Sequence, residues 1–170
     1  MEHVYYETNF NVEEYRNVLL QEYLGNKDNA ELYQYESGNI RWPMHSHYSI
    51  ISKNIPVAQT VADKFEQQYG IKCYPKYYIL DKGYILDAHK DAGTQASFNY
   101  ILSEDNDPLI FTLGIEDVDI EYSKGLLNLQ QIHRVPQSKN KRIILKLSIY
   151  DDTFSVCKRK IKDYENSNLR

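Results

Sequence analysis

The segment HRVPQSKNKRIILKLSIYD, residues 133–151, is the stretch from which we predict the fold of the chain. From residue 142 onward apolar side chains recur at every second position, which predicts a β-strand with two different faces. One face is fully aliphatic and consists of Ile143, Leu145, Leu147 and Ile149. The other face carries Arg142, Ile144, Lys146, Ser148 and Tyr150. Because an unpaired buried arginine is costly, Arg142 lies either in water or beside an internal anion, and the strand alone leaves both possibilities open.

Composition narrows the class of protein. The chain has 170 residues, which suits a single domain with its own core, and a net charge of −4 without a long block of one sign. We therefore expect neither nucleic acid nor a membrane as a partner, and the oligomeric state stays open. The start, MEHVYYETNF, lacks the basic and apolar regions of a secretory signal. Two cysteines form no disulfide framework, so we expect a reducing, cytoplasmic location.

The order of elements predicts helices first and strands afterwards. Helices are expected over residues 11–24, ended by Gly25, and 57–69, opened by Pro56 and closed by Gly70. Short strands are expected near residues 76–80, 84–89, 96–102, 109–113, 125–129 and 142–150, with a strand-like piece at 48–51. We divide the domain into an N-terminal helical and lid region (1–71), a β core (72–151) and a charged C-terminal tail (152–170), where a short, frayed helix is expected from Lys158 onward.

A second motif supplies metal-ligand chemistry. His89 and Asp91 are two residues apart, so on an extended strand their side chains point the same way. His133 follows 44 residues after His89, which is far enough for it to return on another strand. Two imidazoles and one carboxylate are the ligands of a non-haem Fe(II) centre with open coordination positions. We therefore predict that His89, Asp91 and His133 bind iron and form the catalytic centre.

This set of residues resembles the Fe(II)/2-oxoglutarate-dependent dioxygenases, whose pattern is His-x-Asp, a distal His, and an Arg or Lys about ten residues further on. The stretch from His133 to Asp151 is most similar to the prolyl-hydroxylase branch, and the resemblance covers about residues 74–151. It implies a mainly β fold with flanking helices: a double-stranded β-helix (jelly-roll) core preceded by two buttressing α-helices. It also implies Fe(II), with 2-oxoglutarate and O2 as co-substrates.

The same resemblance implies roles for further residues. Arg142 would grip the distal carboxylate of 2-oxoglutarate in a bidentate pair. Asn99 or Tyr100, on the strand after the His-x-Asp turn, would contact the co-substrate, and Lys146 and Ser148 would hold 2-oxoglutarate or a substrate carboxylate. For Asn99, Tyr100 and Lys146 the alternatives of plain packing or solvation stay open. Many relatives carry Ser or Thr where this chain has Ile144, which removes one expected hydrogen bond.

The retained carboxylate of Asp91 favours hydroxylation, because halogenases of the family have Gly or Ala there. The expected substrate is an amino acid, a small metabolite or a peptidyl side chain, and the acidic charge disfavours nucleic-acid demethylation. The pair His45 and His47 is a competing metal suggestion without an obvious third ligand, and the region from Arg41 to Tyr48 is a candidate substrate lid. Two other classes remain as alternatives: a cupin-like metal-binding jelly-roll and a non-catalytic interaction module.

Overall fold

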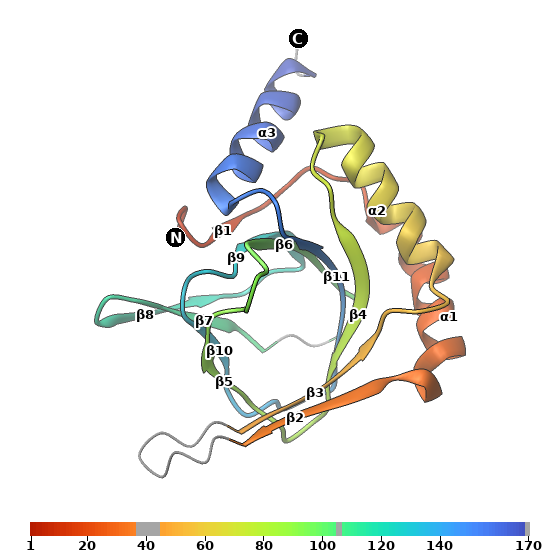
Figure 1. The fold of residues 1–170 in the computed structure, drawn as a ribbon, viewed down its shortest axis with the longest axis vertical. Coiled ribbons are helices and arrows are strands. Elements are labelled where there is room, and N and C mark those ends of the chain that lie inside the picture. The colour runs from red at the N-terminus through yellow and green to blue at the C-terminus, as the bar shows by residue number, and fades with distance from the viewer. Residues whose placement is uncertain (37–44, 105–106, 169–170) are drawn as a thin grey trace.

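The computed structural model describes residues 1–36, 45–104 and 107–168, and the side chains at positions 35, 36, 45 and 46 lie outside this description. Two antiparallel sheets face each other (Figure 1). The larger sheet has the strand order β1-β9-β6-β11-β4-β3-β2 and the smaller one β5-β10-β7-β8. This arrangement, with three helices, is the jelly-roll expected from the sequence, so the fold prediction is confirmed.

The strands of the larger sheet are β1 (Tyr5–Tyr6), β2 (Glu31–Glu36), β3 (His45–Ile51), β4 (Tyr74–Leu80), β6 (Ala96–Ile101), β9 (Lys124–Asn128) and β11 (Arg142–Ile149). Those of the smaller sheet are β5 (Leu86–His89), β7 (Leu109–Leu113), β8 (Glu116–Ile120) and β10 (His133–Val135). The helices are α1 (Arg16–Asn26), α2 (Pro56–Tyr69) and α3 (Phe154–Ser167), and short 3-10 turns, η1 (Glu13–Tyr15) and η2 (Lys27–Asn29), flank α1.

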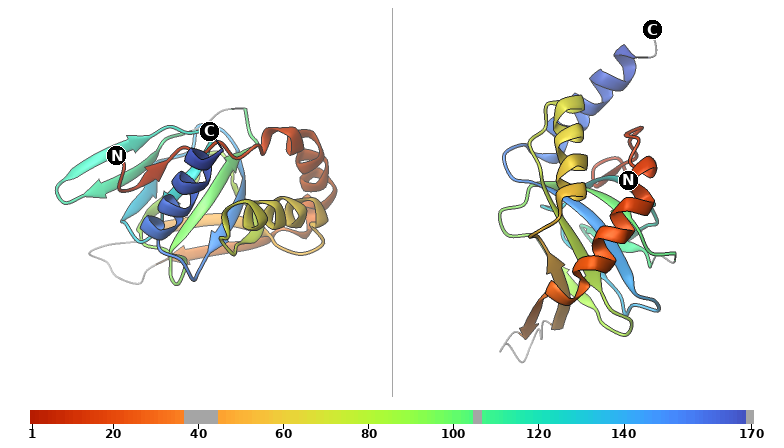
Figure 2. Two further views of the ribbon diagram at one scale, coloured as in Figure 1. Left: turned by 90° about the horizontal axis from the view of Figure 1, so that it is seen from above. Right: turned by 90° about the vertical axis from the view of Figure 1, so that its right-hand side faces the viewer.

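Strand β11 separates two cores. Its aliphatic face, with Leu145, Leu147 and Ile149, packs toward the helices, whereas Ile144 on the opposite face packs between the two sheets. Figure 2 shows α1 and α2 lying along the outer face of the larger sheet. Because side chains alternate along a strand, this placement of the aliphatic face turns Arg142 and Lys146 inward, between the sheets. The alternative in which Arg142 faces water is therefore wrong.

Local chemistry fixes the helices that cover the sheet. Helix α2 begins at Pro56 and ends where Gly70 adopts a left-handed conformation, with φ at 65°, as the sequence predicts. The carboxylate of Glu22 on α1 accepts hydrogen bonds from the backbone N–H groups of Val57 (2.6 Å) and Ala58 (3.0 Å), which have no partner within the helix. The hydroxyl of Tyr77 on β4 donates to the same carboxylate at 2.8 Å, so one side chain ties both helices to the sheet.

Several sequence expectations need correction. The region 1–71 is not only helical, because it supplies β1, β2 and β3 to the larger sheet. Gly25 does not end the first helix, which continues to Asn26. The C-terminal helix starts at Phe154 rather than near Lys158, and its apolar residues Phe154, Cys157 and Ile161 join the main core. Residues 41–44 of the candidate lid lie outside the described residues, and the rest of it belongs to β3. Within the described part of the chain, no helix has the length and apolar content of a membrane span.

Candidate active site

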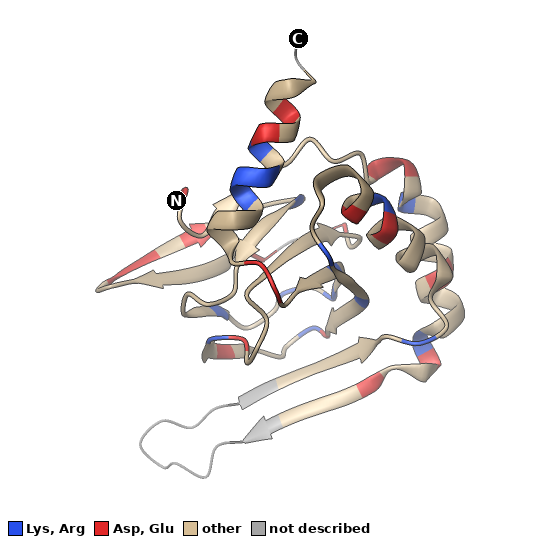
Figure 3. Cartoon of the chain, turned by 45° about the horizontal axis from the view of Figure 1, so that its top comes forward, with Lys and Arg blue, Asp and Glu red and all other residues tan. Residues whose placement is uncertain are grey.

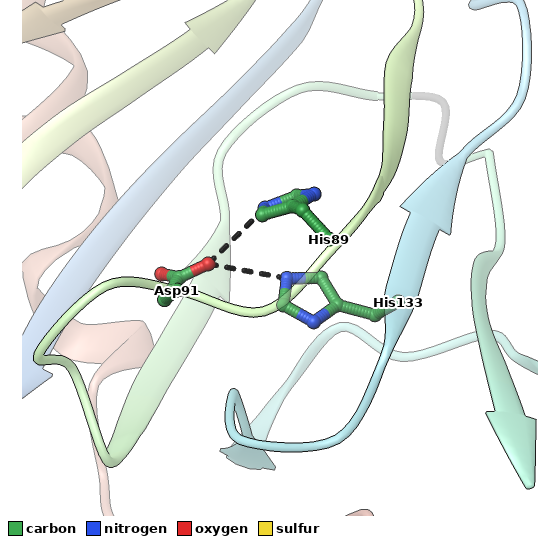
Figure 4. A group of neighbouring side chains, drawn as sticks. All are labelled: His89, Asp91 and His133. Carbon is green, nitrogen blue, oxygen red and sulfur yellow. Dashed lines mark ion pairs between the residues drawn. The ribbon is translucent and has the colours of Figure 1, made fainter. Parts of the chain in front are cut away.

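His89 and His133 face each other across two neighbouring strands. They are direct register partners on β5 and β10, and Asp91 follows His89 just beyond the end of β5. Figure 4 shows the three side chains converging. The Oδ1 atom of Asp91 lies 3.2 Å from Nε2 of His89 and 3.3 Å from Nε2 of His133, and one potential ligand atom from each residue lies within 4.8 Å of the others. Strand register, rather than sequence proximity, thus brings the distal histidine to the His-x-Asp pair.

Backbone carbonyls orient both imidazole rings. Nδ1 of His89 lies 2.6 Å from the carbonyl oxygen of Asp87, and Nδ1 of His133 lies 2.9 Å from that of Gln131. Because a carbonyl only accepts hydrogen bonds, each Nδ1 is the donor, and each Nε2 is directed toward the centre of the triad. Histidine ligands of metals are commonly held in this way, with the non-ligating nitrogen donating to a backbone carbonyl or a carboxylate. The donor set and its orientation therefore fit a divalent metal.

Asp91 is held as a carboxylate. Burial opposes its ionisation, but the contacts with His133 and His89 and the charge of Lys146 outweigh that effect and hold the pKa of Asp91 far below its ordinary value. The two carboxylate oxygens have different partners, since Oδ1 faces the imidazoles and Oδ2 lies 2.9 Å from Nζ of Lys146. An ionised carboxylate with one oxygen free of the lysine is the state that metal binding requires.

Gln130, which the sequence analysis missed, fixes the loop that carries Asp91. Its side-chain amide nitrogen donates to the carbonyl oxygens of Asp91 at 2.9 Å and Thr94 at 2.8 Å. The backbone N–H of Asp91 also donates to the carbonyl oxygen of Leu129 at 3.1 Å. The loop after β5 is thus tied to the segment that precedes His133. No spacing or motif in the sequence signals this role, because it depends on a contact between residues 39 positions apart.

The triad opens into a cavity of about 480 Å³ between the two sheets, within the usual range for a small-molecule site. Its walls include Leu80, Leu86, Leu109 and Ile144, and its polar lining includes Arg142, Lys146 and Asn99. The side chain of Arg142 is 3% exposed, its Nη1 donates to the carbonyl oxygen of Asp107 at 2.6 Å, and its Nε has no hydrogen-bond partner. A buried guanidinium with an unpaired donor favours an anionic ligand in the same cavity.

The other candidate residues lie on different faces of their strands, and only some of them reach the cavity. Asn99 lines the cavity, where its amide donates to the hydroxyl of Tyr122 at 3.1 Å and accepts from Ser97 at 2.8 Å. Tyr100 points the opposite way, into the helix-side core, with its hydroxyl 3.4 Å from Nη1 of Arg16. The expectation that Tyr100 contacts the co-substrate is therefore wrong, because adjacent residues on a strand face opposite sides. Ser148 is buried beyond the cavity lining, and its hydroxyl has no partner.

Three further residues of the lining are aromatic or basic. Tyr78 and Lys76 lie on the inward face of β4, and Tyr122 lies just before β9. The guanidinium carbon of Arg142 lies 5.6 Å from the centroid of the Tyr122 ring, so this ring forms one side of the arginine's pocket. The neighbouring Tyr77 points the opposite way and is fully buried toward the helices.

His47, one member of the competing histidine pair, does not join the triad. The ring of His47 stacks on Tyr84, with a centroid separation of 3.7 Å, and the side chain of His45 lies outside the described residues. Among the side chains that the structure describes, His89, Asp91 and His133 form the single cluster with metal-ligand geometry.

The fold and the cluster together define a class: a double-stranded β-helix with a His-Asp-His set in the cavity between its sheets.

No family model matches the sequence. No curated protein matches it either. Solved structures do share its fold. One is a prolyl hydroxylase from Trichoplax adhaerens in complex with a peptide fragment of the hypoxia inducible factor oxygen degradation domain, with a TM-score of 0.62 and 15% identity over 85% of this chain and 82% of that one. Another is a Pseudomonas putida prolyl-4-hydroxylase, with a TM-score of 0.61 and 14% identity over 86% and 91%. At these identities the likeness establishes the fold.

Proposed function

We propose that this protein is an Fe(II)/2-oxoglutarate-dependent oxygenase that hydroxylates an unactivated C–H bond. One observation carries the proposal: His89, Asp91 and His133 converge in the same cavity into which the incompletely paired Arg142 points. A facial set of two histidines and a carboxylate suits non-haem Fe(II). A buried arginine in the same cavity suits the distal carboxylate of a dicarboxylate co-substrate. The fold shared with two prolyl hydroxylases supports the same conclusion.

Each residue has a defined task in this proposal. The Nε2 atoms of His89 and His133 and the Oδ1 atom of Asp91 hold the metal, while Arg142 holds 2-oxoglutarate by its distal carboxylate and Asn99 lines the same space. When bound, Fe(II) supplies the redox chemistry that couples O2 reduction and the decarboxylation of 2-oxoglutarate, to succinate and CO2, with substrate hydroxylation. Lys146 keeps Asp91 ionised and aligned. The aliphatic walls exclude water from the reacting centre, which strengthens the electrostatic contacts inside it.

The substrate class follows from the size of the cavity and from one structural neighbour. A cavity of about 480 Å³ shared with 2-oxoglutarate accommodates an amino acid, a small metabolite or one side chain of a peptide. The Trichoplax adhaerens enzyme is in complex with a peptide fragment, which makes a peptidyl side chain a reasonable substrate to test for this chain.

Anaerobic titration of the Fe(II)-loaded protein with 2-oxoglutarate tests the proposal directly. We expect the weak visible metal-to-ligand charge-transfer band of the chelated co-substrate in the wild type and its loss in His133→Ala. Iron binding without that band would contradict the proposal and point to a cupin-like metal protein. A wild-type protein that binds no iron would leave an interaction module as the better explanation.

A further inference from the structure

The cavity carries more positive charge than the proposed metal and co-substrate account for. Its described lining contains four cationic side chains, Lys76, Lys90, Arg142 and Lys146, against the single carboxylate of Asp91, a formal surplus of three positive charges. The chain as a whole is acidic, with a net charge of −4. Figure 3 shows acidic residues along β8 and on the helices, outside the space between the sheets. Among the described residues that line the cavity, basic side chains thus outnumber acidic ones.

The proposed ligands do not remove this surplus. A divalent metal and the dianion of 2-oxoglutarate neutralise each other, so the cavity keeps the same formal charge when both are bound. Arg142 accounts for one carboxylate of the co-substrate. Lys146 lies four residues further along β11, which places it about 13 Å away at roughly 3.3 Å per residue. The two cations therefore mark opposite ends of the cavity, with the triad adjoining the Lys146 end through Asp91.

At that end two lysines stand side by side. Lys76 on β4 and Lys146 on β11 are direct register partners in the larger sheet, and both line the cavity. Like charges directly opposite each other on neighbouring strands destabilise a sheet. Lys146 is paired with Asp91, but within the described part of the chain no carboxylate forms an ion pair with Lys76. Burial, and then the charge of Lys146, lower the pKa of Lys76 to about 8, while the nearby carboxylate of Asp91 partly opposes the shift.

We propose that Lys76 and Lys146 bind an anionic group, a carboxylate or a phosphate, of the primary substrate. This inference rests on the oxygenase function proposed above and narrows its substrate to an anionic compound or side chain. An anion between the two ammonium groups offsets their repulsion and places the rest of the substrate next to the triad. Asn99, the register partner of Lys146 on its other side, extends the polar row. Tyr78, whose ring centroid lies 5.7 Å from Nζ of Lys146, adds an aromatic wall beside it.

The test measures anion binding without turnover. Inorganic phosphate is titrated into the Mn(II)-loaded protein saturated with 2-oxoglutarate, and paramagnetic broadening of the ³¹P resonance reports saturable binding near the metal. We expect Lys76→Met to weaken phosphate binding by about ten-fold or more, as the loss of a charge-assisted contact implies, and Lys76→Arg to retain it. The control Lys82→Met removes the same charge from an exposed position just after β4 and should leave phosphate binding unchanged.

Separate measurements of phosphate binding and of 2-oxoglutarate binding distinguish a failure of this inference from a failure of the proposed function. Affinity for 2-oxoglutarate, taken from the anaerobic charge-transfer band, should stay within about three-fold of wild type in Lys76→Met, well under the ten-fold step that 1.4 kcal/mol represents. If both affinities fall together, the lysines hold the co-substrate and the inference is wrong. Broadening that does not depend on Lys76, or no saturable phosphate binding, also overturns it while the oxygenase proposal stands. Absence of the charge-transfer band in wild type defeats the proposed function itself. The thermal midpoint of Lys76→Met should not fall, because the substitution removes a like-charge pair.

Discussion

His89 and His133 are direct partners across the β5–β10 ladder, although 44 residues separate them in the chain. Because register fixes which side chains oppose each other, the distance between the two imidazoles is set by backbone hydrogen bonds rather than by side-chain flexibility. The ring centroids lie 4.4 Å apart, with Asp91 bridging both Nε2 atoms. The fold itself therefore assembles the proposed ligand set.

The first prediction concerns metal stoichiometry. His133→Ala and Asp91→Ala should each reduce bound Fe(II) from one per chain to well below one, because a two-ligand remnant binds weakly. His47→Ala is the matched control, since His47 stacks on Tyr84 away from the triad and its loss should leave the stoichiometry unchanged. Metal analysis after anaerobic loading and desalting measures this. Loss of iron in His47→Ala would show that the ligands are assigned wrongly.

Arg142 should control affinity for 2-oxoglutarate. Hydrogen bonds to charged groups contribute about 1.5–3 kcal/mol each, so Arg142→Met should weaken 2-oxoglutarate binding about 10- to 100-fold. Iron stoichiometry should stay near one, because Arg142 contacts none of the three ligands. Stability should not drop steeply either, since the guanidinium makes one hydrogen bond to a backbone carbonyl and leaves Nε unpaired. An unchanged affinity for 2-oxoglutarate in Arg142→Met would show that Arg142 does not bind the co-substrate.

Gln130 should act as a positioning residue for Asp91. Gln130→Ala removes the two side-chain hydrogen bonds to the Asp91 loop. Loss of such an outer contact typically costs about 10- to 100-fold in metal affinity. Competition with a chromogenic chelator measures the metal dissociation constant independently of turnover. Gln137→Ala, at an exposed site, is the control and should match wild type. Equal metal affinity in the Gln130 and Gln137 variants would mean that the loop holds its shape unaided.

Glu22 should contribute strongly to stability. Glu22→Ala leaves two N–H groups at the start of α2 without their carboxylate and takes one acceptor from Tyr77, so we expect a loss of about 2–3 kcal/mol in the free energy of unfolding. Denaturant unfolding measures the loss. Glu14→Ala, at an exposed position, should change stability by less than about 0.5 kcal/mol. A small effect at Glu22 would show that water caps α2 equally well.

Lys76 should make the stability of the metal-free protein depend on pH. Burial first, and then the charge of Lys146, lower its pKa in the folded state to about 8, against 10.5 for the ordinary side chain, while Asp91 partly opposes the shift. Between these values the unfolded chain holds the proton and the folded chain releases it, so stability rises with pH. Lys76→Met should remove this rise. Urea unfolding of both proteins at pH 7.5 and pH 9.5 measures the difference, and parallel pH profiles would contradict the prediction.

The amino-acid sequence carries the parts of this protein that depend on neighbours along the chain. Pro56 and Gly70 bound α2 because one fixes the backbone of the first helical turn and the other tolerates a left-handed conformation. The two faces of β11 follow from strict alternation, and the His-x-Asp pair with a distal histidine predicts the cluster that the fold assembles. These features depend on the spacing of residues along the chain, which can be observed directly in the sequence.

Other features depend on contacts between distant segments. The pattern of β11 has two faces, but only the helices packed against Leu145 and Leu147 decide that Arg142 and Lys146 point inward. Strands as short as β1 and β10 offer too few residues for a periodic signal and exist because a neighbouring strand completes their hydrogen bonds. The pairing of Lys76 with Lys146 likewise depends on register, since 70 residues separate these lysines in the chain and a shift of one position would turn one of them out of the cavity.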